Sequence, residues 1–116
     1  MNEIPLFSSL SIKSITLRNR VVLSPMCQYK AKDGMISDWH LQHYSRFAFS
    51  GLGAAFIEAT GVLPEGRIGH GCTGIWCDDH IEGLSKIAKT FKEYNCVSGI
   101  QLAHAGRKAS FLRPWD

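Results

Sequence analysis

The sequence predicts an α/β fold in which about three parallel strands alternate with two helices behind an N-terminal hairpin. Three short apolar runs, at 20–24, 54–60 and 97–103, have the composition of buried strands. The two stretches between them carry apolar residues three and four positions apart, which is typical of amphipathic helices. Alternating strand and helix signals favour a parallel sheet with right-handed crossover connections.

Composition places the chain among globular proteins of one domain. It has 116 residues, of which 45% are hydrophobic and 20% charged, and a net charge of +3 that is scattered along the sequence. Nucleic-acid binding is therefore not expected, since it requires a dense basic patch. No apolar run approaches the ~20 residues of a membrane helix, and the N-terminus lacks the pattern of a signal peptide. A cytoplasmic location with four free thiols is expected.

The first elements are short and extended. Residues 9–17 alternate polar and apolar side chains, which predicts a half-exposed hairpin. Arg20 to Ser24 is a continuous apolar run, which predicts a strand buried on both faces. Pro25 ends that strand because proline has no N–H to donate to a neighbouring strand.

The first helix is expected at 39–50, with Asp38 as its N-cap. Ala54 to Thr60 then reads as a second buried strand. The second helix is expected at 81–94 behind a cap at Asp78 or Asp79, and the third strand at 97–103. The strands begin roughly 35 to 40 residues apart, the repeat length of a (β/α)8 or TIM barrel with long loops, so the sequence predicts three of the eight strands of an incomplete barrel.

Polar and unusual residues follow directly after each predicted strand. They occupy positions 24–29 after the first, 58–61 at the end of the second and 101–108 on the third. Ligands of α/β folds bind at the carboxyl ends of the strands and in the loops that follow them. The three clusters therefore predict one shared site.

Six segments, in order, carry a resemblance to a known family. The segments are Ser24–Tyr29, Asp38–His40 with His43, Tyr44 and Arg46, Glu58–Thr60, Pro64–Ile68, Gly74–Trp76 and Gln101–Lys108. On these segments the chain resembles the NADPH dehydrogenases of the old yellow enzyme family, in the bacterial and fungal subgroup with a cysteine in the first loop, along essentially its whole length.

The resemblance implies that residues 1–116 are the N-terminal part of an FMN-binding TIM barrel. In such ene-reductases NADPH reduces the flavin, which passes a hydride to an activated alkene such as an enone. The backbone at Ser24, Pro25 and Met26 would lie along the flavin ring, and Cys27 would contact its O4/N5 edge. Ala59 would contribute a backbone contact, Gln101 would hydrogen-bond the pyrimidine side, and Tyr29 would face the substrate.

The same resemblance implies that no catalytic residue lies within these 116 residues. The family's substrate-binding histidine pair, its tyrosine proton donor and its phosphate loops have no counterpart here. We therefore expect a truncated portion that is inactive alone, unstable or associating. The alternative is a non-catalytic remnant that associates with further copies of itself or with a full-length homologue.

Simpler interpretations stand beside these assignments. Cys27 could be an inert buried thiol, Gln101 a satisfied core amide, and Tyr29 a cap on the barrel mouth. Histidine and arginine at 104 and 107 could brace loop carbonyls or approach the flavin, while Trp39, His40 and His43 are expected to be packing and surface residues. Four potential zinc ligands between positions 70 and 80 lack paired spacing, so no metal site is expected. Residues 51–56 superficially resemble a dinucleotide fingerprint, but they lack its third glycine, and they follow a helix and open a strand, which is the reverse of the required order.

Overall fold

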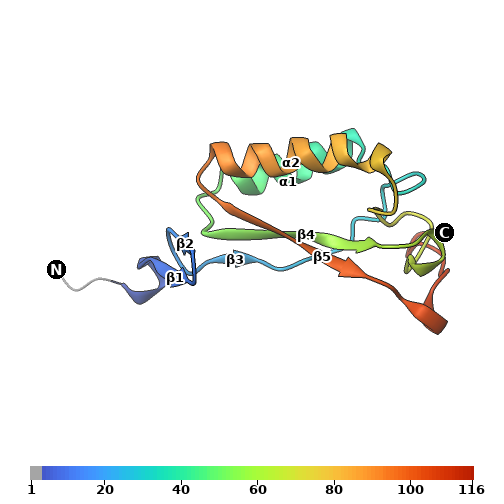
Figure 1. The fold of residues 1–116 in the computed structure, drawn as a ribbon, viewed down its shortest axis with the longest axis horizontal. Helices are drawn as coiled ribbons and strands as arrows, with labels where there is room; N and C mark the ends of the chain where they lie inside the picture. Colours follow the sequence, from blue (N-terminus) through green and yellow to red (C-terminus); the bar gives the residue numbers. More distant parts are fainter. Residues whose placement is uncertain (1–3) are drawn as a thin grey trace.

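The computed structural model describes residues 4–116 and has two sheets and two helices (Figure 1). The first sheet is an antiparallel hairpin of β1 (Leu10–Ile12) and β2 (Ile15–Leu17). The second is parallel and contains β3 (Val22–Leu23), β4 (Ala54–Gly61) and β5 (Val97–Ala103). The helices are α1 (Asp38–Ala48) and α2 (Ile81–Glu93).

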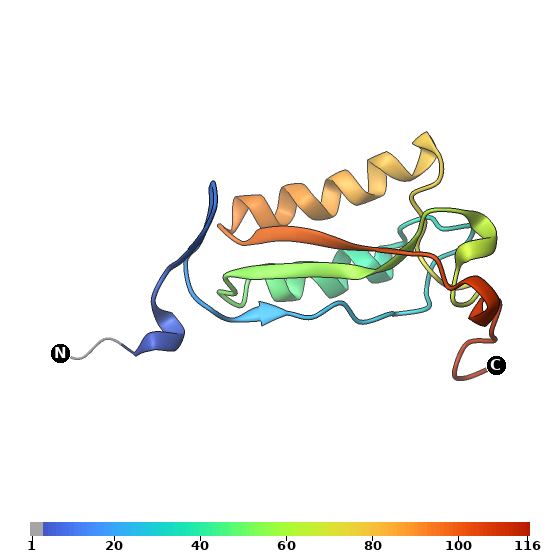
Figure 2. The same ribbon diagram turned by 60° about the horizontal axis from the view of Figure 1, so that its bottom comes forward.

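The parallel sheet has the strand order β3-β4-β5, so each helix connects two neighbouring strands. Val22 pairs with Ala54, and Ala54 pairs with Val97. Both helices lie on the same face of the sheet, as Figures 1 and 2 show from two directions. The α/β fold with a three-stranded parallel sheet, two helices and an N-terminal hairpin is thus confirmed as the architecture of a partial barrel. None of the helices in residues 4–116 has the length and apolar character needed to span a membrane.

The hydrophobic core fills the space between the helices and the sheet. Tyr44 of α1 and Phe91 of α2 are 2% and 0% exposed, and their rings meet edge to face at 6.1 Å between centroids. The core is completed by the buried residues Leu23, Ala48, Ala55, Ile57, Ile87 and Cys96. The apolar stripe predicted for the second helix therefore packs as expected, through Ile87 and Phe91.

The predicted N-cap of α1 was wrong by one residue. Ser37 caps the helix, because His40 Nδ1 accepts hydrogen bonds from the Ser37 N–H at 3.1 Å and from the Ser37 hydroxyl at 2.9 Å. Asp38 is instead the first helical residue, where a carboxylate favours the positive end of the helix dipole. α1 ends at Ala48 and α2 at Glu93, so each helix stops one or two residues before the predicted end.

The prediction of strands buried on both faces was wrong for β3 and β5 and held for most of β4, whose Phe56 is 41% exposed. β3 has two residues, and its Val22 is 43% exposed; β5 is mostly exposed or half-buried, with Leu102 62% exposed. The helices cover one face of the sheet, and within residues 4–116 no layer covers the other (Figure 2). Continuous apolar runs identify such strands, but their burial requires a second covering layer.

β4 contains one more residue than the segment of β5 with which it pairs. Ile57 pairs with Ile100 and Thr60 with Leu102, so Glu58 and Ala59 together face the single residue Gln101. A β-bulge of this kind turns two successive side chains towards the same face. Around this bulge, Ile57 and Glu58 both point to the helix layer. Ile57 packs in the core cluster that contains Tyr44, and Glu58 is hydrogen-bonded to Tyr44.

Candidate functional site

The predicted cofactor residues lie at one edge of the parallel sheet. Ser24, Pro25, Met26 and Cys27 follow β3 directly, whereas Ala59 lies in the last third of β4 and Gln101 near the end of β5. Because β4 lies between β3 and β5, the carboxyl ends of all three strands meet at this edge, which faces the C-terminal loops in Figure 1. The structure thus places the three sequence clusters side by side.

The bulge brings Ala59 and Gln101 next to each other. Ala59 is buried, and Gln101 is exposed beside it on the uncovered face of the sheet. Gln101 is exposed within residues 4–116, so the interpretation as a satisfied core amide does not hold for this part of the chain. An amide can donate and accept at once, which suits the alternating edge of a pyrimidine-like ring.

A buried carboxylate beneath the site holds the first loop in place. Glu58 Oε2 accepts a hydrogen bond from the Gln28 N–H at 3.0 Å, which fixes the backbone between Cys27 and Tyr29. The Tyr44 hydroxyl donates to Glu58 Oε1 at 3.0 Å and accepts from the Glu58 N–H at 2.8 Å. Glu58 belongs to the polar cluster at 58–61 but was given no individual role, although an acidic residue within an apolar strand was a usable signal.

His40 is the second polar group buried beneath the loop, in agreement with the expectation of a packing or surface residue. Its Nδ1 accepts from Ser37, so Nε2 carries the proton and lies 3.6 Å from Glu58 Oε1. Burial lowers the pKa of His40 to about 4 and raises that of Glu58 to about 7. Although the separation is that of an ion pair, both groups are therefore neutral at mildly acidic pH, because neither reaches water.

Two thiols meet where the loop after β3 touches the loop after β4. A hydrogen bond between Cys27 and Cys72 raises the pKa of Cys27 and lowers that of Cys72 to about 6. The backbone of Ala59 also hydrogen-bonds Cys27, which ties the thiol to the end of β4. Cys27 is half-buried and remains protonated, so it presents a neutral S–H donor at the site.

Tyr29 adopts an unusual backbone conformation within the same loop. Its φ of 54° lies in the left-handed region, which non-glycine residues seldom occupy and which often accompanies functional sites. Its ring packs edge to face on Trp115 at 6.3 Å, and burial raises the pKa of its hydroxyl. The side chain is half-buried at the loop surface, and its role towards a substrate stays a prediction.

His104 and Trp39 each form a hydrogen bond within the described residues. His104 Nδ1 accepts from the Gly106 N–H at 3.1 Å, which braces the loop after β5. Trp39 is 51% exposed, and its Nε1–H donates to Gln28 Oε1 at 3.1 Å.

The four potential zinc ligands lie in separate environments. His70 is beside Asp116, Cys72 contacts Cys27, and the exposed Cys77 lies 3.5 Å from Nδ1 of the buried His80. Within the described part of the chain, no three His, Cys, Asp or Glu side chains converge on one point.

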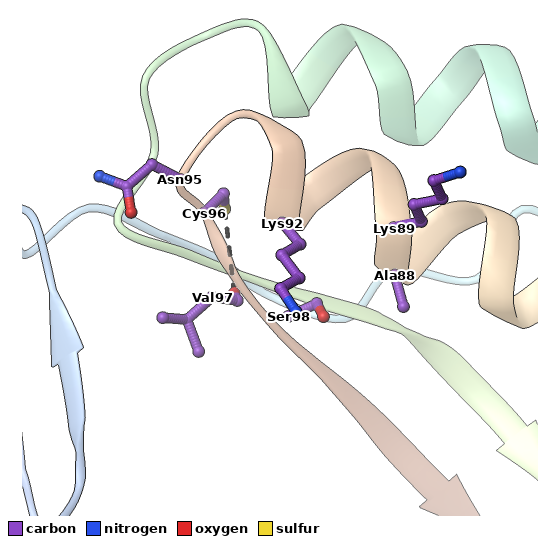
Figure 3. Close-up of a pocket in the computed structure, with 7 residues that line it drawn as sticks. All are labelled: Ala88, Lys89, Lys92, Asn95, Cys96, Val97 and Ser98. Carbon is purple, nitrogen blue, oxygen red and sulfur yellow. Dashed lines mark hydrogen bonds between the residues drawn. The ribbon is translucent and has the colours of Figure 1, made fainter.

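A surface hollow lies away from the candidate site. It has a volume of about 550 Å³ and lies between the C-terminal half of α2 and the start of β5 (Figure 3). Its lining includes Lys89, Lys92, Cys96 and Ser98. This is the amino end of the strand, where α/β barrels do not place their active sites.

Comparison with known proteins identifies the relatives of the chain. The profile of the NADH:flavin oxidoreductase / NADH oxidase family matches residues 5–113. The NADPH dehydrogenase of Geobacillus thermodenitrificans is 49% identical over 111 residues, which cover 94% of this chain and 32% of the relative. That of Bacillus subtilis is 48% identical over 106 residues, which cover 90% and 31%. The chain thus spans about a third of the length of these relatives.

Solved structures agree with the sequence relatives. The Old Yellow Enzyme from a Pichia species superposes with a TM-score of 0.83 at 27% identity, covering 90% of this chain and 28% of that one. The old yellow enzyme from Trypanosoma cruzi gives 0.81 at 30% identity, with the same coverage. The match to the family profile over nearly all residues, together with these folds, shows that the chain belongs to the NADH:flavin oxidoreductase / NADH oxidase family, whose old yellow enzymes it resembles in structure.

Proposed function

We propose that this chain supplies one wall of an FMN site in an NADPH-dependent oxidoreductase that reduces activated alkenes such as enones. The observation that carries the proposal is the meeting of Cys27, Ala59 and Gln101 at the carboxyl edge of three parallel strands. The identity of 49% to an NADPH dehydrogenase supports NADPH as the reductant.

The residues at this edge suit an isoalloxazine ring. FMN, when bound, supplies the redox centre that the protein itself lacks. The Gln101 amide is exposed and can both donate and accept towards the pyrimidine side of the ring. Cys27 offers a weak S–H donor without a fixed charge, and the backbone of Ser24, Pro25 and Met26 would lie along the ring. Tyr29 would face the substrate from the same loop.

Glu58 would act through its neighbours. Its hydrogen bond from the Gln28 N–H fixes the loop that carries Cys27 and Tyr29. It is buried and makes no contact with solvent, so it is a positioning residue in this proposal.

A chimera tests the proposal, because the relatives are about three times longer than this chain. Residues 1–116 would replace the matching segment of the Bacillus subtilis NADPH dehydrogenase. We expect the chimera to retain FMN through gel filtration and to oxidise NADPH with an enone, whereas the 116 residues alone should show no turnover. Gln101→Leu should weaken FMN binding about tenfold, the loss of one or two hydrogen bonds.

Gln42→Leu provides the matched control, since Gln42 is an exposed glutamine on α1. It should leave FMN affinity unchanged. Equal FMN affinity in the Gln101 and Gln42 variants, or a folded chimera without FMN, would contradict the proposed site.

A further inference from the structure

Cys27 and Cys72 are held together by the backbones of two loops. The Ala31 N–H donates to the Gly71 carbonyl oxygen at 2.9 Å, which joins the loop after β3 to the loop after β4. A side chain at Gly71 would place its Cβ 2.5 Å from the Tyr29 carbonyl oxygen, so the loops touch through a glycine. The two thiols, one residue beyond Gly71 and two before Tyr29, are therefore fixed as neighbours.

The surroundings of the pair favour its oxidation. Cys72 is 1% exposed, whereas Cys27 is half-buried and can be reached from the surface. The Cys27 hydrogen bond, the backbone N–H groups of Gly69 and Ile68 and the charge of Arg67 lower the pKa of Cys72 to about 6. Near neutral pH the lowered pKa of Cys72 therefore favours a thiolate on one sulfur of the pair while the other sulfur keeps its proton.

We propose that Cys27 and Cys72 form a reversible intrachain disulfide when a hydroperoxide oxidises Cys27, the half-buried and more accessible member of the pair. Cys27 is the sulfur that meets the oxidant, and Cys72 is the sulfur that resolves the product. The pair is thus a two-electron modification site beside the candidate cofactor edge, and it requires no cofactor to react.

The proposed steps balance with hydrogen peroxide as the oxidant. The proton of Cys27 first passes to the Cys72 thiolate, and the resulting Cys27 thiolate attacks one peroxide oxygen. The O–O bond breaks, and the proton now on Cys72 passes to the departing hydroxide, giving water, a Cys27 sulfenic acid and a Cys72 thiolate. The Cys72 thiolate then attacks the Cys27 sulfur, the S–S bond forms, and hydroxide leaves and takes a proton from solvent. The two sulfurs lose two electrons in total, and the peroxide gains them.

The remaining cysteines have other neighbours. Cys96 is 4% exposed at the start of β5, with its S–H directed to the Val97 carbonyl oxygen at 3.8 Å. Cys77 is exposed and lies 3.5 Å from His80 Nδ1. Cys77 therefore offers a matched control, as an accessible thiol outside the pair.

The experiment counts and maps thiols in the full 116-residue chain after treatment with hydrogen peroxide. Oxidation should remove two of the four thiols, lower the intact mass by two hydrogen atoms and give one peptide pair joined through Cys27 and Cys72. Excess dithiothreitol should restore all the thiols. Cys77→Ser should still lose two thiols, whereas Cys27→Ser and Cys72→Ser should form no intrachain disulfide.

Peptide mapping of the unsubstituted chain decides the question even if a serine variant fails to fold. A full set of free thiols after peroxide, a disulfide that involves Cys77 or Cys96, or a bond only between two chains would overturn the proposal. The result is separable from FMN binding, because the disulfide is measured without flavin and the chimera can be assayed under reducing conditions.

Discussion

At the scale of single residues, folding transfers a proton within a buried pair. Between about pH 4.5 and 6.5 the unfolded chain carries that proton on His40, since the ordinary pKa values are 4.5 for Glu58 and 6.5 for His40. In the folded chain burial raises the pKa of Glu58 to about 7 and lowers that of His40 to about 4, so the proton lies on Glu58. The number of bound protons is unchanged, and the pair therefore adds no pH slope to the free energy of unfolding in this range.

When one partner is replaced, the free energy of unfolding should depend on pH through the remaining partner. The two variants should show pH slopes of opposite sign. In Glu58→Gln the remaining His40 has a lowered pKa, so the unfolded chain binds more protons and stability is lost as the pH falls from 6.5 towards 4. In His40→Gln the remaining Glu58 has a raised pKa, so the folded chain binds more protons and stability is lost as the pH rises from 4.5 towards 7. Each full change is on the order of 3 kcal/mol.

Urea unfolding at about pH 4.5, 5.5 and 6.5 measures both variants and the unsubstituted chain. The unsubstituted chain should show the flattest profile over this interval. Slopes of the same sign in the two variants would contradict the proton transfer.

The sequence predicts the residues at the carboxyl edge of the sheet better than it predicts the buried residues that hold them in place. The strand ends followed from apolar runs and the proline, which are local signals. Glu58, Tyr44 and His40 were missed as a group because their contact depends on α1 packing against β4, which no local pattern records. The Ser37 cap was missed for a related reason, since its partner is a histidine in place of the usual Glu or Gln.

At the scale of elements, α2 depends on two residues that fill the space between the helices and the sheet. Ile87 is 1% exposed and Phe91 is 0% exposed, and Phe91 contacts the Tyr44 ring. The sequence predicted this stripe well, because helical periodicity depends only on spacing along the chain. The burial of β3 and β5 was predicted less well, because it depends on what lies over the sheet.

Phe91→Ala should destabilise the chain by about 3–5 kcal/mol, through lost burial and the cavity left beside Tyr44. Phe49→Ala is the control, because Phe49 is 62% exposed and packs on Tyr94 at the surface. Chemical denaturation followed by circular dichroism measures both. Similar losses in the two variants would show that the helix layer does not form the core.

At the scale of the whole molecule, the chain is open and extended. Its radius of gyration is 15.5 Å, where a compact domain of this length has about 13 Å. It exposes 7490 Å², against roughly 6,300 Å² for a compact monomer of this mass. Val22 and Phe56 account for part of the excess, on the sheet face that is uncovered within residues 4–116.

We expect the isolated 116-residue chain to associate through this face and the free edge of β5, which remains available for pairing. Phe56→Lys should shift the chain towards monomer, because a charge at this 41% exposed position on the uncovered face opposes burial. Leu63→Lys is the control, at a 45% exposed leucine outside the strands. Sedimentation velocity over a range of concentrations would distinguish them, and a chain that stays monomeric at high concentration would contradict the expectation.

Because β4 contains one extra residue, the support of the site depends on the exact length of this strand. Ile57 and Thr60 are three positions apart, while their partners Ile100 and Leu102 are two apart. Removing Ala59 would restore a regular ladder, but Glu58 would then turn away from Tyr44 and lose its hold on the first loop. A one-codon deletion here would leave the composition and hydropathy of the strand almost unchanged and still dismantle the support of the site.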